Sequence, residues 1–216
     1  MHIPDAFIPI PQGIVYWVIA LVFVALALRW AKDEMSEEKI PLVAVLAAGI
    51  FALQSFNLPV SMGTSGHLVG GALAAIVLGS PFAAVFILSL VLIVQGVLFG
   101  DGGITTMGAN ILNMGVIGGF VGFYTFKGLM GATKSMPASA FAAAWLACVI
   151  PALACAVEMF IAGTFPLTEG LLAMGLYHAA IGVIEGIVTV VAILLIMKAR
   201  PDIVKLGVKA AKGAGA

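Results

Sequence analysis

Charged residues are scarce in this chain of 216 residues: only 9% are Asp, Glu, Lys or Arg, while 62% are hydrophobic. Soluble domains carry about 25% charged residues, so water could not wet a surface of this composition. Ten basic residues balance ten acidic ones, and a net charge of zero provides no electrostatic surface for nucleic acid. The uncharged runs exceed the roughly 18 residues that mark a transmembrane helix. The composition excludes soluble and disordered chains and indicates a polytopic membrane protein.

Cysteines and catalytic motifs are also few. Cys148 and Cys155 are seven residues apart, which places them roughly 10 Å apart along a helix, beyond disulfide reach, so we expect both to pack. The chain has no Ser-His-Asp, CxxC or HExxH pattern, and Thr133 stands where a phosphate-binding loop requires glycine. We therefore expect no enzyme activity, no organic cofactor and no ATP site in this chain.

The basic residues predict the topology. They fall in three clusters, at 29–39, 127–134 and 198–212, which we place on the cytoplasmic side. Each stretch between two clusters must then contain an even number of crossings: four fit before the second cluster and two after it, at about 20 residues each. One more crossing precedes the first cluster. The prediction is an all-α protein of the cell membrane with seven transmembrane helices, the N-terminus outside and the C-terminus cytoplasmic. The expected spans are 13–29, 41–57, 67–79, 82–99, 110–126, 139–162 and 171–197.

Two histidines on the predicted outer side form a candidate metal site. The amine of Met1, the amide nitrogen of His2 and the His2 ring Nδ1 can chelate one ion in a five- and a six-membered ring. The imidazole of His67 can fill the fourth position in the plane. Four nitrogens in a plane suit Ni²⁺ or Cu²⁺, and Co²⁺ with a different geometry or further ligands. We expect Met1 to be retained, because its removal normally requires a small second residue.

Domain organisation follows from these assignments. We expect one transmembrane domain over residues 1–200, with a metal-chelating segment at 1–12 that its prolines stiffen. Residues 201–216 are expected to form a short basic cytoplasmic tail that contacts anionic lipid of the bilayer.

Polar side chains surround the candidate site in the sequence. Some are expected to orient the His67 ring through its second nitrogen, although ordinary loop polarity explains them equally well. These side chains are Gln54, Asn57, Ser61, Thr64 and Ser65. In the glycine-rich stretch 100–110, the polar residues indicate an outer lid or a helix cap.

Three further ionisable residues lie within the predicted spans. His178 and Glu185 share one face of the last helix, and Glu158 lies in the helix before it. Ionisable groups at membrane depth are costly and often functional. They form either a proton relay or inner ion site, or a polar clamp between helices.

Three segments of the chain resemble the CbiM/NikM family, the substrate-binding (S) components of energy-coupling factor (ECF) importers for cobalt and nickel. The segments are Met-His-Ile-Pro-Asp at the start, Gly-Thr-Ser-Gly-His-Leu-Val-Gly-Gly-Ala-Leu at 63–73, and Gly-Asp-Gly-Gly-Ile-Thr-Thr-Met-Gly-Ala-Asn at 100–110. The family's metal ligands map onto Met1, His2 and His67. The resemblance implies a transmembrane coupling (T) subunit, separate cytoplasmic ATPases and, in many members, a small accessory membrane protein.

The resemblance leaves alternatives open. It does not distinguish nickel from cobalt as the transported substrate, although four nitrogen ligands favour nickel. A stand-alone proton- or ion-coupled carrier that uses His178, Glu185 and Glu158 is the second hypothesis. A membrane assembly or sensor protein that transports nothing is the third, and no feature of the sequence favours it.

Overall fold

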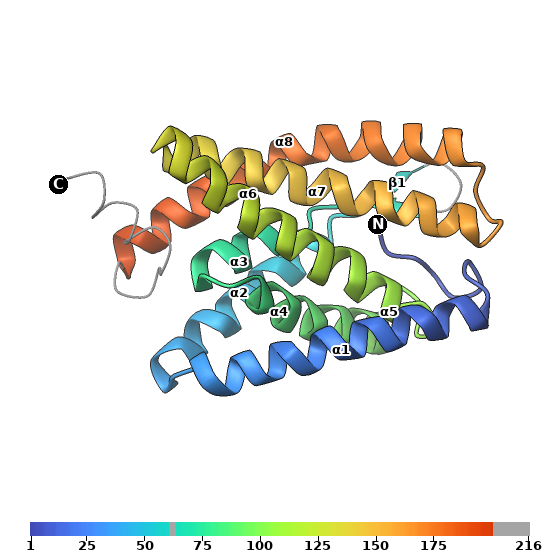
Figure 1. The fold of residues 1–216 in the computed structure, drawn as a ribbon, viewed down its shortest axis with the longest axis horizontal. Coiled ribbons are helices and arrows are strands. Elements are labelled where there is room, and N and C mark those ends of the chain that lie inside the picture. The colour runs from blue at the N-terminus through green and yellow to red at the C-terminus, as the bar shows by residue number, and fades with distance from the viewer. Residues whose placement is uncertain (61–63, 201–216) are drawn as a thin grey trace.

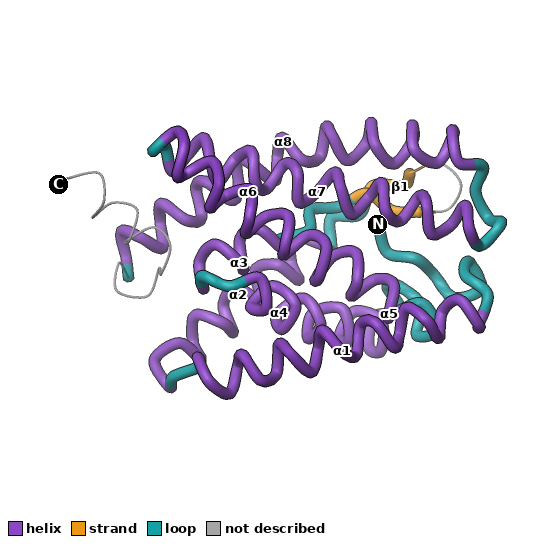
Figure 2. Tube along the Cα trace, in the orientation of Figure 1, coloured by secondary structure: helices purple, strands orange, loops and turns teal. Residues whose placement is uncertain are grey.

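The computed structural model describes residues 1–60 and 64–200, and these build a bundle of helices with one short hairpin (Figures 1 and 2). The predicted tail at 201–216 and Ser61 lie outside the described residues. In chain order, the elements are α1 (Ile10–Glu34), η1 (Glu37–Lys39), α2 (Ile40–Gln54), β1 (Leu58–Val60), β2 (Thr64–Gly66), α3 (Gly71–Leu78), α4 (Pro81–Val94), η3 (Gln95–Phe99), α5 (Met107–Asn110), η4 (Ile111–Ile117), α6 (Gly118–Thr133), α7 (Met136–Ile161) and α8 (Leu167–Ala199).

The described helices form seven continuous rods, and the charge pattern predicts seven transmembrane crossings. The π-helical η3 continues α4, and the π-helical η4 joins α5 to α6. Five rods are long and apolar enough to cross a membrane: α1, α4 with η3, α5 to α6, α7 and α8. The other two, α2 and α3, have only 15 and 8 residues. The prediction of an all-α, multi-pass membrane protein is therefore confirmed.

The structure corrects the predicted third span. We expected a helix over 67–79, but α3 begins only at Gly71, and the segment before it is irregular. Gly70 has a left-handed backbone (φ 80°), which ends any helical continuation toward the N-terminus. An antiparallel hairpin that the hydropathy pattern did not predict precedes this segment and pairs Val60 with Thr64. It carries the chain from α2 back toward the interior of the bundle.

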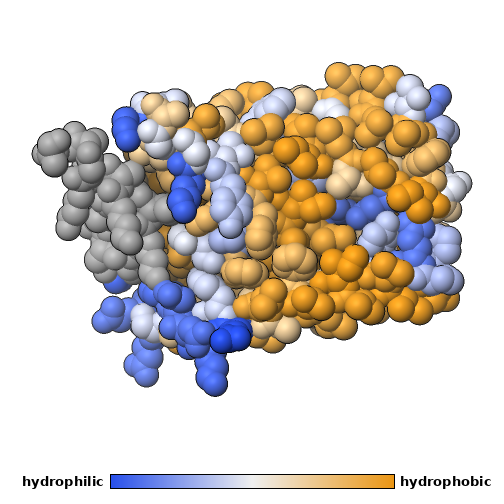
Figure 3. Space-filling view, viewed as in Figure 1, coloured by the Kyte–Doolittle hydropathy of each residue, from blue (hydrophilic) through white to orange (hydrophobic). Residues whose placement is uncertain are grey.

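The surface has the polarity of a membrane protein. Apolar side chains cover the middle of the visible face, and hydrophilic ones gather at its two ends (Figure 3). The α1–α2 turn, the α6–α7 turn and the end of α8 lie together at one end of the bundle (left in Figure 1). These are the segments that contain the described members of the three basic clusters. The shared location agrees with one membrane side for all three clusters.

Close packing of α7 against α8 forms one side of the core. A Cβ placed on Gly182 would lie 2.9 Å from the ring of Trp145, and one on Gly186 would lie 2.5 Å from the ring of Phe141. Glycines spaced by four therefore let aromatic rings of α7 approach the α8 backbone closely. The N-terminus lies inside the bundle, near α7 and β1 (Figure 1). This arrangement brings the first residues of the chain to the hairpin that precedes His67.

Candidate metal centre

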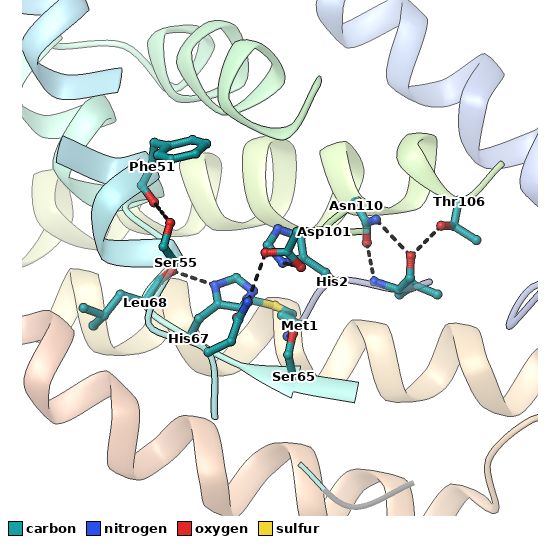
Figure 4. A network of polar contacts seen from close by, with 12 residues as sticks. Met1, His2, Phe51, Ser55, Ser65, His67, Leu68, Asp101, Thr106 and Asn110 are labelled. Atoms are coloured by element: carbon teal, nitrogen blue, oxygen red, sulfur yellow. Dashed lines mark hydrogen bonds and ion pairs between the residues drawn. The ribbon is translucent and has the colours of Figure 1, made fainter. Parts of the chain in front are cut away.

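The first three residues of the chain are buried, and the backbone of Ile3 is held at both of its polar groups. Its N–H donates to Asn110 Oδ1 at 2.8 Å. Its carbonyl accepts from Asn110 Nδ2 at 3.2 Å and from Thr106 Oγ1 at 2.5 Å (Figure 4). Met1, His2 and Ile3 are each 3% exposed or less. The α5 region thus fixes the position of the segment that carries His2.

Asp5 makes a second attachment to the same loop. Its carboxylate accepts from the N–H of Thr105 at 2.8 Å, from the Thr105 hydroxyl at 2.5 Å and from the N–H of Ile104 at 3.2 Å. The hydrogen bond from the Thr105 hydroxyl is the main cause that lowers the pKa of Asp5. The 100–110 stretch, whose polar residues indicate a lid or helix cap in the sequence, therefore anchors the N-terminal segment.

The three predicted metal ligands come together in the interior. The amine of Met1 donates to Ser65 Oγ at 3.0 Å. The His2 and His67 rings stack with their centroids 4.4 Å apart and their planes inclined by 20°. Figure 4 shows the two rings beside Met1 and Ser65. The fold thus places a terminal amine and two imidazoles from distant parts of the sequence within one buried site.

The nitrogens of this site favour their neutral forms. Burial lowers the pKa of the Met1 amine to about 5, and burial holds the pKa of His67 well below its usual value. His67 Nδ1 lies 2.8 Å from the carbonyl oxygen of Leu68, which can only accept, so we assign the proton to Nδ1. His67 Nε2 is buried and has no hydrogen-bond partner within the described chain. At neutral pH, the amine and Nε2 each present a lone pair for a cation.

His2 faces a carboxylate in this structure. Its Nδ1 lies 3.0 Å from Asp101 Oδ1, and Asn57 Nδ2 donates to Asp101 Oδ2 at 3.0 Å. Burial raises the pKa of Asp101, but the contacts with His2 and Asn57 outweigh it and leave that pKa below its usual value. Burial lowers the pKa of His2, and the Asp101 carboxylate opposes this shift. A chelate through Nδ1, as predicted from the sequence, requires the His2 ring to turn away from Asp101.

Four of the side chains predicted to orient His67, those at positions 54, 57, 64 and 65, have other partners, and the carbonyl of Leu68 bonds to the His67 ring. Within the described residues, Ser65 accepts from the Met1 amine and Asn57 donates to Asp101, so both act on other parts of the site.

Two further predicted residues bind the backbone or a sulfur atom. Gln54 Nε2 donates to the carbonyl of Val69 at 2.8 Å, and Thr64 Oγ1 donates to Met174 Sδ at 3.3 Å. Gln54 therefore holds the segment after His67 rather than the ring. Thr64 ties the hairpin to α8.

The two intramembrane glutamates have separate partners. Glu185 accepts from the N–H groups of Val69 and Gly70, each at 2.8 Å. Glu158 Oε2 accepts from Asn113 Nδ2 at 2.6 Å. Both carboxylates thus link one helix to another segment of the bundle. The choice between a polar clamp and a proton relay or inner ion site stays a prediction.

His178 is fully buried on α8. Its Nδ1 lies 2.8 Å from the carbonyl of Met174, one helical turn earlier, and its Nε2 has no hydrogen-bond partner within the described chain. The Sγ of Cys148 lies 3.7 Å from the carbonyl of His178. Cys148 and Cys155 are both buried and unbridged, in agreement with their predicted packing role.

Side chains alone do not provide a complete metal site in the described residues. No group of three or more His, Cys, Asp or Glu side chains in residues 1–60 and 64–200 could hold a metal ion. A site at His2 and His67 must therefore use backbone or terminal nitrogens as well. The buried amine of Met1 and the amide of His2 are such donors, and both adjoin the two imidazoles.

Sequence reasoning missed Asn110 and Thr106 as the residues that hold Ile3. Their amide and hydroxyl groups were visible in the glycine-rich stretch 100–110, but no pattern linked them to the N-terminus. Gly102 adopts a left-handed backbone (φ 90°), and a Cβ on the neighbouring Gly103 would overlap the backbone nitrogen of Asp5. The glycines of this stretch thus allow the loop to approach the N-terminal segment.

Comparison with known proteins identifies related sequences and folds. The family model for the cobalt uptake substrate-specific transmembrane region, CbiM, matches residues 2–203. A putative metal transport protein of Haloquadratum walsbyi is 39% identical over 207 residues, which cover 94% of this chain and 93% of that protein. A putative fused nickel transport protein, NikMN, of Archaeoglobus fulgidus is 35% identical, covering 99% of this chain and 70% of that one. The cobalt transport protein CbiM of Geobacter sulfurreducens is 32% identical, covering 100% of this chain and 65% of that protein.

Solved structures show the same fold. The crystal structure of a truncated transition metal transporter superposes with a TM-score of 0.86 at 28% identity, and the match covers 92% of this chain and 99% of that one. A second transition metal transporter has a TM-score of 0.87 at 27% identity and covers 96% of this chain and 97% of that one. The agreement spans nearly the whole chain in each case.

Proposed function

Because the chain belongs to the CbiM family of cobalt uptake substrate-specific transmembrane proteins, we propose that it captures Ni²⁺ or Co²⁺ as its substrate at Met1, His2 and His67. The family establishes a role in metal uptake and a transporter rather than an enzyme. Relatives that are named for nickel or cobalt transport support this choice of substrate.

One observation carries the proposed binding site: a buried terminal amine lies beside two stacked imidazoles. The amine, the amide nitrogen of His2, its ring and the ring of His67 supply four nitrogens. Neutral nitrogen donors suit late first-row divalent ions, and a planar set of four favours nickel over cobalt. The amide nitrogen must lose its proton as the metal binds, so binding releases a proton to solvent.

We further propose that the chain is the S component of an ECF-type importer. In this assignment, a transmembrane T subunit and separate cytoplasmic ATPases drive translocation, and a small accessory membrane protein assists where present. The basic end of the bundle faces the cytoplasm, because Lys and Arg concentrate in cytoplasmic loops. The metal site then lies toward the outer side, where it can capture the ion before transport.

Uptake of radioactive Ni²⁺ and Co²⁺ into proteoliposomes tests this assignment. We expect uptake only when the T subunit and the ATPases are present with ATP, and we expect it to fall to background for His2→Ala. The control is the same complex of this chain, the T subunit and ATPases, with ATPases that cannot hydrolyse ATP. Equal uptake with and without ATP hydrolysis would contradict the assignment.

The alternative is a stand-alone carrier that uses His178, Glu185 and Glu158. It predicts uptake by the chain alone, driven by a proton gradient and lost in Glu185→Gln. Vesicles that contain only this chain distinguish the two. The hydrogen bonds of both glutamates to neighbouring segments support a structural role and favour the ECF assignment.

A further inference from the structure

The short segment that follows His67 is held from α8 by a buried carboxylate. Glu185, 2% exposed, directs one oxygen to the N–H of Val69 and the other to the N–H of Gly70, both at 2.8 Å. These N–H groups lie directly before α3, whose first residue is Gly71. An anion at a helix N-terminus is favourable, because unpaired N–H groups and the helix dipole both attract it.

A second helix holds the same segment from its other side. Gln54, at the end of α2, donates to the carbonyl of Val69 at 2.8 Å. Gly70 packs so closely that a Cβ there would lie 2.7 Å from the side chain of Ile50. Residues 69–70 are therefore fixed between α2 and α8. The ring of His67 depends on this segment, since its Nδ1 bonds to the carbonyl of the next residue, Leu68.

The other half of the metal site is held by different elements. The two hydrogen bonds between Asn110 and Ile3 attach the segment that carries His2 to α5. The carboxylate of Asp5 attaches the same segment to the loop before α5. The two imidazoles thus belong to separately anchored parts of the bundle. The two rings keep their relative positions only if the contacts on the N-terminal segment and those on residues 69–70 are both intact.

We propose that Glu185 is a positioning residue that sets the His67 imidazole for metal binding. This inference rests on the proposed function, because it concerns the same metal site. Glu185 touches no ligand atom of that site and acts through the backbone of residues 69–70. An intact pair of bonds requires two acceptor oxygens, which a carboxylate supplies. The amide of Glu185→Gln supplies one oxygen and an NH₂ group that faces an N–H, so one bond is lost.

Ni²⁺ titration of the purified full chain tests the proposal, with the absorption spectrum of bound Ni²⁺ as a second readout. We expect Glu185→Gln to weaken binding about 10- to 100-fold, the usual effect of losing a partner that orients a metal ligand. Its Ni²⁺ spectrum should shift toward that of His67→Ala, because both variants lose the His67 nitrogen as a well-placed ligand. In a His67→Ala background, Glu185→Gln should cause no further loss.

Glu158→Gln is the matched control. It replaces the carboxyl group of the other buried glutamate by an amide, and that glutamate binds Asn113 and not the His67 segment. We expect wild-type Ni²⁺ affinity and spectrum for this variant. If Glu185→Gln does not fold, Gln54→Met replaces it, since this change removes the other bond to the segment and should give the same spectral shift.

Wild-type affinity and spectrum for Glu185→Gln, or for Gln54→Met in its place, would overturn the inference. Weaker binding with an unchanged spectrum would also overturn it, because His67 would still be a ligand. The proposed function fails in a different way: His67→Ala would then bind Ni²⁺ as tightly as the wild type.

Discussion

The imidazole rings of His2 and His67 lie face to face, with centroids 4.4 Å apart and planes inclined by 20°. One ring comes from the N-terminal segment and the other from the loop between β2 and α3. Stacked rings of this kind also occur as simple packing, so the stack itself does not establish a ligand role. The nitrogens of the two rings, rather than their aromatic faces, must carry metal binding.

Replacement of His67 by phenylalanine separates packing from ligation. His67→Phe keeps an aromatic ring next to His2 but removes both nitrogens. We expect a folded protein that binds Ni²⁺ at least about 100-fold more weakly, a larger loss than the 10- to 100-fold typical of an orienting partner. Isothermal titration with Ni²⁺, together with a melting curve, measures both properties. Tight binding by this variant would remove His67 from the site.

Asn110 holds the N-terminal segment through two hydrogen bonds to Ile3. Asn110→Ala leaves the buried N–H of Ile3 without its acceptor, so the amine and His2 lose their fixed placement. We expect Ni²⁺ affinity to fall about 10- to 100-fold while the bundle stays folded. Hydrogen exchange at residues 2–8 should become faster in the variant. Unchanged exchange and affinity would show that other contacts suffice to hold the segment.

The hydrogen bonds of Asp5 to residues 104 and 105 make the attachment of the N-terminal segment dependent on pH. Hydrogen bonds from Thr105, above all from its hydroxyl, lower the pKa of Asp5 below the ordinary value of 3.8. The folded state therefore favours the carboxylate, and its stabilising effect is complete above the unfolded pKa and lost as the pH falls through the folded one. The protection of the amides at residues 2–8 from hydrogen exchange, relative to the intrinsic rate at each pH, should fall below about pH 4, the ordinary range of an Asp. Asp5→Asn should show low protection already at neutral pH and little further change in protection on acidification; a wild-type profile would argue against the attachment of Asp5 to Thr105.

Gly108 allows α1 to approach α5. A Cβ on Gly108 would overlap the backbone of Trp17 in α1. Since backbone atoms cannot move aside as a side chain can, we expect Gly108→Ala to destabilise the protein by about 1–3 kcal/mol. Gly128→Ala is the control, because nothing lies within 4 Å of a Cβ there. Melting curves in one detergent should show a lower midpoint for Gly108→Ala alone; equal midpoints would contradict the close helix contact.

The sequence predicts the helical rods well, because long uncharged runs and the placement of basic residues determine them almost without tertiary information. It also predicts that Met1, His2 and His67 form one group, since their donor chemistry and predicted side of the membrane agree. The late start of α3 at Gly71 escapes prediction. That boundary lies at Gly70, whose left-handed backbone precedes α3, and the N–H groups of Val69 and Gly70 bond to Glu185, a residue more than a hundred positions later.

The polar partners of the site were the hardest to predict. Leu68 orients His67 through its main-chain carbonyl, which no side-chain pattern reveals. Asp101 faces His2 only because the loop between η3 and α5, about a hundred residues along the chain, lies against the N-terminal segment. Hydropathy and charge determine which segments are buried, but they do not determine which buried polar atoms meet.

Ni²⁺ titration of the protein with Met1 as its first residue, against a version with one alanine added before Met1, tests directly whether the terminal amine binds the metal. The added residue moves the amine out of the position next to Ser65 Oγ and converts the Met1 nitrogen into an amide. We expect tight 1:1 binding by the native N-terminus and loss of that binding on extension, with both proteins equally stable in melting curves. Equal affinity in the two proteins would show that the buried amine of Met1 is not a metal ligand.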